Sequence, residues 1–225
     1  MIDKPAFIVF EGVDGAGKGV QSRLLLSTLN TAGINTILTR EPGGSPGAEM
    51  IRKLIVEGDA EQWDSMTELL LINAARRSHL VETVWPALAA GTWVISDRFA
   101  DSSRAFQGIA GNLGLKTVEL IHEQVADSFK PDLVLILDLD PSVSLERTVM
   151  RGGTEDRFEK KGLAYQEKVR QGFHQLAEQD SDSRVLIDAS GTPEEVFSRV
   201  LTTVNNKLGT ELKLDSSTVA QAFSK

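Results

Sequence analysis

The sequence contains no cysteine among its 225 residues. Disulfide bonds, thiolate nucleophiles and zinc–thiolate sites are therefore excluded. No apolar run approaches the roughly 20 residues that a helix needs to cross a bilayer, and the first residues do not have the layout of a signal peptide. We therefore expect a cytoplasmic protein with no membrane partner.

Positive charge is also scarce. The chain has 24 lysines and arginines against 32 aspartates and glutamates, which gives a formal net charge of −8. A nucleic-acid-binding surface needs an excess of basic residues, so no nucleic-acid partner is expected. Places where arginines do cluster are therefore informative in this chain.

A glycine-rich segment, FEGVDGAGK at residues 10–18, is the strongest motif. An apolar strand pattern precedes it, and apolar residues at helical spacing follow it, which is the setting of a phosphate-binding loop. Glycines let backbone N–H groups turn towards a phosphate, and Lys18 can reach the transferred phosphoryl group. The candidate ATP-binding residues here are Gly12, Val13, Asp14, Gly15, Ala16, Gly17, Lys18 and Gly19.

One position departs from the usual form of this loop. Gly19 stands where a serine or threonine hydroxyl would be expected to bind Mg²⁺. Other groups must then hold the metal, and Mg²⁺ needs few protein ligands because it keeps several waters. A nucleotide-binding protein without catalysis is the alternative.

Apolar runs that are typical of buried parallel strands alternate with helical patterns. The runs lie at residues 7–10, 36–39, 93–96, 133–137 and 185–187. This order predicts an α/β protein with a parallel five-stranded sheet, and helices on both faces. We expect one domain over residues 1–208, with a lid segment at about 148–162 and a C-terminal tail at 209–225.

Charged residues fall where these strands end, at the edge of the sheet where ligands bind. Arg40, with Glu41 and Pro42, leaves the second strand in a turn that could press against a phosphorylated substrate; a surface ion pair is the alternative. Asp97 is the candidate Mg²⁺ ligand at the end of the third strand, and Arg98 can grip a phosphate, although a structural ion pair would look the same.

Three arginines surround a Gly-Gly pair further along the chain, at Arg147, Arg151 and Arg157. They predict a lid that closes over phosphates, excludes water and supplies charge to the transition state. Replacing Lys18 or Arg157 with alanine should then lower turnover by orders of magnitude and leave the fold intact. The alternative is a solvated basic helix surface, which suits Lys160 and Lys161 better than the arginines.

These motifs together resemble the thymidylate kinases, which phosphorylate dTMP to dTDP with ATP. The resemblance covers residues 7 to about 208. It is carried by the segments at 10–18, 39–44, 97–98, 101–108 and 155–159. It implies a P-loop NTPase fold of the nucleoside monophosphate kinase type, a three-layer αβα sandwich, with Mg²⁺ bound together with ATP, and a catalytic arginine in the lid as in bacterial members.

The resemblance also implies roles for individual residues. Asp14 would contact the sugar 3′-hydroxyl, Arg98 and Arg40 would hold the monophosphate, and Arg76 would bind the pyrimidine carbonyl. The remaining implied contacts are Glu41, Pro42, Ser103 and Gln107 with the substrate, Phe106 with the sugar, and Arg147, Ala189 and Ser190 with ATP.

A second departure concerns the base. The family usually has a phenylalanine near Arg76 for stacking on thymine, whereas this chain has Ile72 and Asn73 there. An aliphatic face or another aromatic, such as Phe99, would have to replace the ring. The alternatives are a kinase for another acceptor, such as dUMP, a modified pyrimidine deoxynucleotide or AMP, a nucleotide-bound regulatory module, and a relative with impaired catalysis. The family implies a homodimer, and the apolar positions at 69–88 could supply its face.

Overall fold

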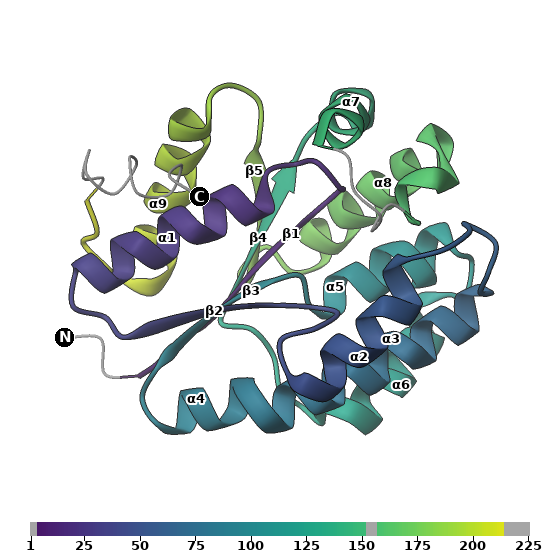
Figure 1. Ribbon diagram of the computed structural model, residues 1–225. Helices are drawn as coiled ribbons and strands as arrows, with labels where there is room; N and C mark the ends of the chain where they lie inside the picture. The colour runs from purple at the N-terminus through teal and green to yellow at the C-terminus, as the bar shows by residue number, and fades with distance from the viewer. Residues whose placement is uncertain (1–3, 152–156, 214–225) are drawn as a thin grey trace.

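The computed structural model describes residues 4–151 and 157–213. Its centre is a five-stranded sheet in the order β2-β3-β1-β4-β5, and every pair of neighbouring strands is parallel (Figure 1). The strands are β1 (Phe7–Gly12), β2 (Thr36–Arg40), β3 (Trp93–Asp97), β4 (Leu133–Asp138) and β5 (Arg184–Asp188). Each predicted strand is confirmed, and each extends one or two residues beyond its predicted bounds.

The central strand β1 is buried along its whole length, which explains its unbroken apolar run. It pairs with β3 on one side and β4 on the other, so Phe10 lies beside both Asp97 and Leu135. Parallel pairing brings the carboxyl ends of the strands to the same edge. The charged residues at these ends are therefore brought to one side of the sheet, as the sequence predicts.

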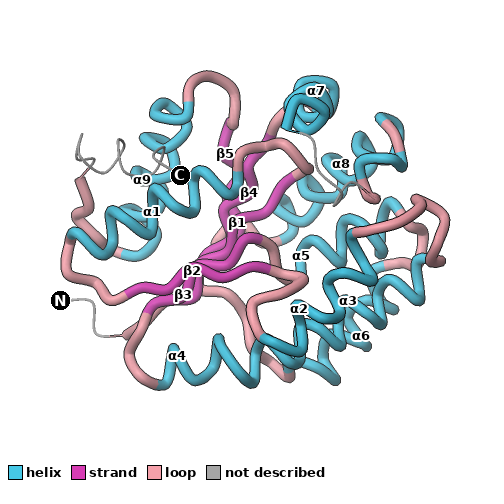
Figure 2. The backbone as a smooth tube through the Cα atoms, viewed as in Figure 1, coloured by secondary structure: helices cyan, strands magenta, loops and turns pink. Residues whose placement is uncertain are grey.

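Helices cover both faces of the sheet (Figure 2). The helix α1 (Lys18–Thr31) packs with α9 (Pro193–Leu208) on one face, whereas α4 (Trp85–Ala89), α5 (Ala100–Ser103) and α8 (Leu163–Gln179) contact the strands from the other. The predicted three-layer αβα sandwich is confirmed. The other helical elements are α2 (Pro46–Val56), α3 (Ser65–His79), α6 (Leu115–Ala126), α7 (Pro141–Arg151), the π-helical segments Leu80–Val84 and Arg104–Ala110, and the 3-10 turn Glu159–Lys161.

Local sequence signals set several helix starts. Ser45 accepts a hydrogen bond from the Ala48 backbone and is followed by proline, and Thr192 forms a capping box with Glu195. The helix α3 continues into α4 without a break, because the π-helical segment Leu80–Val84 joins them.

The domain boundary at residue 208 coincides with the end of α9, and the division into domain and tail stays a prediction. Residues 214–225 of the predicted tail, and 152–156 of the predicted lid, lie outside the described residues. In the described part of the chain, no helix has the length and apolar character needed to cross a membrane.

Candidate active site

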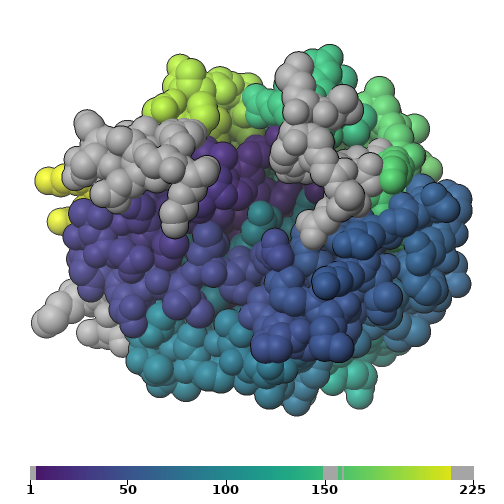
Figure 3. Space-filling model, in the orientation of Figure 1, coloured from purple at the N-terminus to yellow at the C-terminus, as the bar shows by residue number. Residues whose placement is uncertain are grey.

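A cavity of about 1290 Å³ opens at the carboxyl ends of β1, β2 and β3. It is lined by the glycine-rich loop, the turn after β2, and segments of α2, α3 and α7. In the space-filling view the surface is hollowed between the glycine-rich loop with α1 and the α2–α3 region (Figure 3). The predicted phosphate loop and the predicted substrate turn therefore face a common space.

The glycine-rich loop is held tightly against the rest of the domain. Gly12 and Gly15 have φ angles of 129° and 81°, and a Cβ atom at either would collide with the carbonyl oxygens of Leu137 and Ser144. Only glycine fits such positions, because they combine a left-handed backbone with close approach of another chain segment. The backbone of the loop is thus fixed at these two positions by its close approach to the segments that carry Leu137 and Ser144.

Lys18 is buried at the base of this loop, and its Nζ donates to the backbone oxygens of Gly12 (3.1 Å) and Val13 (2.8 Å). Burial, reinforced by Arg98, lowers the pKa of Lys18 to about 8, although Asp97 and Asp14 work in the opposite direction. A buried ammonium group has lost its hydration, so a phosphate that binds beside it would strongly stabilise its charged form.

Arg98 joins the end of β3 to the glycine-rich loop. Its Nη1 donates to Gly12 O (2.9 Å) and Ser102 Oγ (3.0 Å), and its Nη2 donates to the Asp14 carboxylate. The Phe106 ring lies under the guanidinium, 5.2 Å from centroid to Cζ. Three residues predicted to surround the acceptor's sugar and phosphate, Asp14, Arg98 and Phe106, therefore form one cluster.

Glu11 lies behind this cluster and is fully buried. Its carboxylate accepts from the Phe99 N–H (2.8 Å), the Ser102 N–H (3.0 Å) and the Ser102 hydroxyl (2.5 Å). Burial raises the pKa of Glu11 to about 7 against the opposing charge of Arg98. Sequence reasoning gave Glu11 no role; the structure shows that it fixes the backbone next to Arg98.

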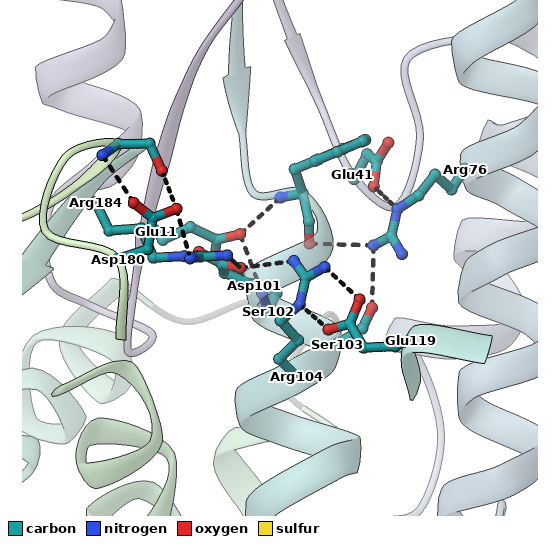
Figure 4. A network of polar contacts seen from close by, with 12 residues as sticks. Glu11, Glu41, Arg76, Asp101, Ser102, Ser103, Arg104, Glu119, Asp180 and Arg184 are labelled. Atoms are coloured by element: carbon teal, nitrogen blue, oxygen red, sulfur yellow. Dashed lines mark hydrogen bonds and ion pairs between the residues drawn. The ribbon is translucent and has the colours of Figure 1, made fainter. Parts of the chain in front are cut away.

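A second ion-pair network supports the same segment from further inside (Figure 4). Asp101 accepts from Arg104 (2.7 Å) and from Arg184 (2.6 Å), and Arg104 also pairs with Glu119 (2.5 Å). Asp101 is buried, and these partners come from β5 and α6 as well as from its own neighbourhood. The segment carrying Arg98, Ser102 and Ser103 is therefore held on several sides before any ligand binds.

Arg76 forms the inner wall of the cavity. Its Nε donates to Glu41 (2.7 Å), and its Nη2 donates to Ser103 Oγ (3.0 Å) and to the Phe99 backbone oxygen (3.1 Å). Burial opposes ionisation of Glu41, but Arg76 and His79 hold its pKa below the usual value. The predicted substrate residues Glu41, Arg76 and Ser103 are thus one preformed, buried unit, whereas the contribution of His79 was missed by sequence reasoning.

Gln107 also faces the cavity and is almost fully buried. Its Nε2 donates to Glu68 (3.0 Å), whereas its Oε1 has no hydrogen-bond partner. A buried carbonyl oxygen without a partner is costly unless a ligand supplies a donor. Ile72 and Phe99 both line the cavity, so the structure offers both of the surfaces considered as replacements for the missing aromatic ring.

The structure changes the interpretation of Arg157. Its side chain is fully buried, 2.7 Å from Glu68, and it also donates to the backbone oxygens of Asp59 (2.9 Å) and Ala60 (3.1 Å). Its removal would take away a buried ion pair and the donor to several backbone oxygens, so the structure argues against the prediction that Arg157→Ala leaves the fold intact. The guanidinium is outside the cavity lining, and its catalytic role stays a prediction.

Lys161 also differs from the solvated surface considered for it, because its Nζ lies 2.7 Å from Glu68 and its side chain is mostly buried. Lys160 is exposed and lines the cavity, as a basic surface residue would. Glu68 therefore holds together two residues of the predicted lid region. Sequence reasoning missed it, since a glutamate in a helical pattern has no distinguishing signal.

Comparison with known proteins identifies the family. The family model described as thymidylate kinase matches residues 10–200. The chain belongs to the thymidylate kinase family. It is 46% identical over 204 residues to thymidylate kinase of Jannaschia sp., covering 91% of this chain and 98% of that protein. The corresponding values for thymidylate kinase of Caulobacter vibrioides are 46% over 203 residues, with coverage of 90% and 97%.

A solved structure agrees with these matches. The thymidylate kinase of Ehrlichia chaffeensis superposes with a TM-score of 0.74 at 30% identity, covering 89% of this chain and 99% of that one. The predicted family, the P-loop α/β fold and the enzyme class are confirmed. The enzyme phosphorylates dTMP to dTDP with ATP, and no finding favours the alternatives of another acceptor or impaired catalysis.

Thymidylate kinases use ATP with Mg²⁺, and the residues of this cavity fit such a metal. Asp97 lines the cavity with a half-buried carboxylate, and its Oδ2 lies 3.8 Å from the point where a Cβ on Gly19 would be. Within residues 4–151 and 157–213, no cluster of three or more candidate metal ligands exists. One carboxylate is compatible with Mg²⁺, which is commonly held by one or two carboxylates, substrate phosphates and water.

The remaining predicted site residues of this thymidylate kinase lie in different places. Arg40, Pro42 and Arg147 line the cavity, and Arg40 pairs with Glu49 at 2.9 Å. Ala189 is buried and Ser190 exposed after β5, outside the lining of this cavity. The side chain of Arg151 lies outside the described residues.

Proposed function

We propose that the acceptor dTMP binds between Arg98 and Arg76 in this cavity. The observation that carries the assignment is that both arginines, one on α3 and one after β3, are held in place by the segment that follows β3: Arg98 by Ser102 together with Asp14, and Arg76 by Ser103 together with Glu41. Arginine presents a planar fork that matches phosphate oxygens. Arg98, together with Arg40 at the cavity edge, would hold the 5′-phosphate.

The base would lie towards Arg76 and Gln107. Arg76 Nη2 is close to Ser103 Oγ, and Gln107 Oε1 is a buried acceptor without a partner. A pyrimidine such as thymine offers a carbonyl oxygen for the first and an N–H for the second. Ile72 and Phe99 would supply apolar surface to the ring, and Phe106, whose ring lies against Arg98, would contact the sugar near Asp14.

The phosphates of ATP would bind at residues 12–19, with Lys18 at the transferred group. The acceptor phosphate is already an anion, so the protein needs to bring two repelling groups into line and offset their charge, and needs no strong general base. Lys18, Arg98 and Arg147 would offset that charge from different sides of the cavity. Asp97 would hold Mg²⁺, which, when bound, offsets charge on the phosphate oxygens, and Ala189 and Ser190 would flank adenine.

Comparing dTMP, dUMP, dCMP and AMP as phosphate acceptors tests this placement of the base. We expect kcat/KM to be highest for dTMP and lower for dUMP, dCMP and AMP, because the cavity offers apolar surface for a methylated ring and a single acceptor at Gln107. Equal values for dTMP and AMP would contradict the placement of the base. The measurement is ADP release in a coupled assay at saturating ATP and Mg²⁺, with a no-acceptor blank for each preparation.

We also propose a homodimer formed through α2, α3 and α6, which lie side by side (Figure 1). Large apolar side chains are exposed on these helices, including Met50 (74%), Leu70 (53%) and Leu120 (55%). Soluble monomers rarely leave such side chains clustered, and a second copy of the chain would cover them. The predicted apolar positions at 69–88 divide between core and surface, since Leu69 is buried and Leu70 is exposed.

Sedimentation velocity tests the dimer. We expect a dimer at micromolar concentration that dissociates in Leu70→Glu or Leu120→Glu. Leu163→Glu is the matched control, because Leu163 is similarly exposed (43%) but lies on α8. A monomeric wild-type protein, or dissociation only in the control, would contradict the proposal. Because both substrates are nucleotides of the cell interior, we propose the cytoplasm as the location.

A further inference from the structure

Arg23 lies one turn after Gly19 on α1. Helical side chains point towards the N-terminus of their helix, so a residue at i+4 covers the turn before it. In agreement, Arg23 Nη1 lies 3.5 Å from the point where a Cβ on residue 19 would be, and Asp97 Oδ2 lies 3.8 Å from the same point. The space left by the missing hydroxyl side chain is therefore faced by a guanidinium and a carboxylate.

The guanidinium of Arg23 is available to a ligand. Its side chain is exposed, it lines the cavity, and it makes no hydrogen bond or ion pair within the described residues. By contrast, three other cavity arginines hold carboxylates: Arg40 with Glu49, Arg76 with Glu41 and Arg98 with Asp14. An unpaired arginine beside a phosphate loop, in a chain with net charge −8, is suited to an anionic ligand.

We propose that Arg23 binds the phosphates of ATP and compensates for the absence of a hydroxyl at position 19. This inference rests on the proposed binding of ATP phosphates at residues 12–19. Gly19 has no side chain to separate Arg23 from the loop, so the guanidinium reaches over it towards the phosphate oxygens near Lys18. In other loops of this type, a serine or threonine hydroxyl binds the Mg²⁺ that offsets the charge of the phosphates. Here Arg23, as a second cation beside Lys18, would offset part of that charge directly.

The geometry also permits the missing hydroxyl to be restored. A Cβ at position 19 would make only ordinary van der Waals contacts with Arg23 and Asp97, so Gly19→Ser should fold without strain. Its hydroxyl would enter the space between the two side chains. If Arg23 compensates for that hydroxyl, the two substitutions must interact, and the loss caused by Arg23→Ala should be smaller when Ser is present at position 19.

The test compares wild type, Arg23→Ala, Arg23→Lys, Gly19→Ser and the double variant Gly19→Ser with Arg23→Ala. Calorimetric titration with ATP, with and without Mg²⁺, gives a readout independent of turnover. We expect Arg23→Ala to weaken ATP binding at least tenfold with and without Mg²⁺, to lower kcat/KM for ATP by a similar factor or more, and to leave KM for dTMP within twofold. Arg23→Lys should lie in between, because it keeps the charge but loses the planar fork.

Lys116→Ala is the matched control, since it removes an exposed cation from α6, outside the cavity lining. ATP binding by Arg23→Ala within twofold of wild type would overturn the proposal, and so would an equal loss in Lys116→Ala. A change confined to KM for dTMP, or the same loss with glycine and serine at position 19, would also overturn it. A wild type that binds ATP but does not phosphorylate dTMP would refute the proposed function, while the ATP titrations would still decide the role of Arg23.

Discussion

Arg157 and Glu68 form a buried ion pair in which Nη2 and Oε1 are 2.7 Å apart, with side chains only 0% and 1% exposed. Removing one partner of such a pair typically costs about 3–5 kcal/mol when the other charge is left unpaired, and less here because Glu68 keeps Lys161 at 2.7 Å. We expect Arg157→Ala to lower the free energy of unfolding in urea by up to about 3 kcal/mol. Lys53→Ala, on the exposed side of α2, should change it by less than about 0.5 kcal/mol.

Measuring kcat of the same Arg157→Ala variant distinguishes a structural role of Arg157 from a catalytic one. A structural role alone predicts that the folded fraction of Arg157→Ala keeps most of the wild-type kcat. A catalytic role predicts a fall of orders of magnitude even under conditions where the variant is fully folded. Equal unfolding free energies for Arg157→Ala and wild type would contradict the structural role.

Gln107 provides a prediction for recognition of the base. Gln107→Leu removes the buried Oε1 acceptor and leaves Glu68 with its partners Arg157 and Lys161. We expect KM for dTMP to rise about tenfold, which corresponds to about 1.4 kcal/mol, while KM for ATP is unchanged. Steady-state kinetics with each substrate varied in turn makes the measurement. An unchanged KM for dTMP would show that Gln107 does not contact the base.

Lys18 provides a prediction for pH dependence. Because burial and Arg98 lower the pKa of Lys18 to about 8, the free enzyme loses this positive charge as the pH rises through that value. We expect kcat/KM for ATP to fall about tenfold per pH unit above about pH 8. Lys18→Arg, whose side chain stays protonated, should be less active but should show no such fall. A wild-type profile that stays flat to pH 10 would contradict the prediction.

Glu11 should make stability depend on pH in the opposite way from an ordinary ion-paired carboxylate. Burial raises its pKa from 4.5 to about 7, so between these values the folded state keeps a proton that the unfolded state has lost, and stability falls as pH rises. One pKa unit corresponds to about 1.4 kcal/mol, so Glu11→Gln should gain about 3 kcal/mol relative to wild type over this range.

Urea unfolding of wild type and Glu11→Gln at about pH 5 and about pH 8 makes the comparison, because every other titrating group is shared by the two proteins. The expected result is a difference in unfolding free energy that shifts in favour of the variant at the higher pH. A difference that is the same at both pH values would show that Glu11 does not titrate between them.

Much of the fold follows from patterns that the sequence states directly. The run at residues 7–10 is apolar because β1 is buried on both faces, and residues 10–18 combine glycines with Lys18 at fixed spacing. Such signals depend only on residues close together in the chain, so they can be recognised without knowledge of the tertiary structure. The convergence of Asp14 and Arg98 follows from strand order, because β1 and β3 are adjacent and parallel.

The partners of Glu68 and Glu11 have no comparable signal. Glu68 meets Arg157 and Lys161 across 89 and 93 positions of the chain, and Glu11 meets Ser102 across 91. Which carboxylate becomes buried depends on how helices from distant segments pack, and the residue types alone are those of an ordinary surface. For the same reason, the burial of Arg157 could not be predicted from its position in the predicted lid.

We propose that the γ-phosphoryl group of ATP is transferred to dTMP while Arg98 holds the acceptor phosphate. Transfer of label from γ-labelled ATP to dTMP by wild type and by Arg98→Ala tests this most directly. We expect labelled dTDP from the wild type, and less than about one hundredth of that rate from a folded Arg98→Ala protein that still binds ATP, since Arg98 would both hold the acceptor phosphate and offset charge during transfer. Equal rates for the two proteins, or no labelled dTDP from the wild type, would contradict it.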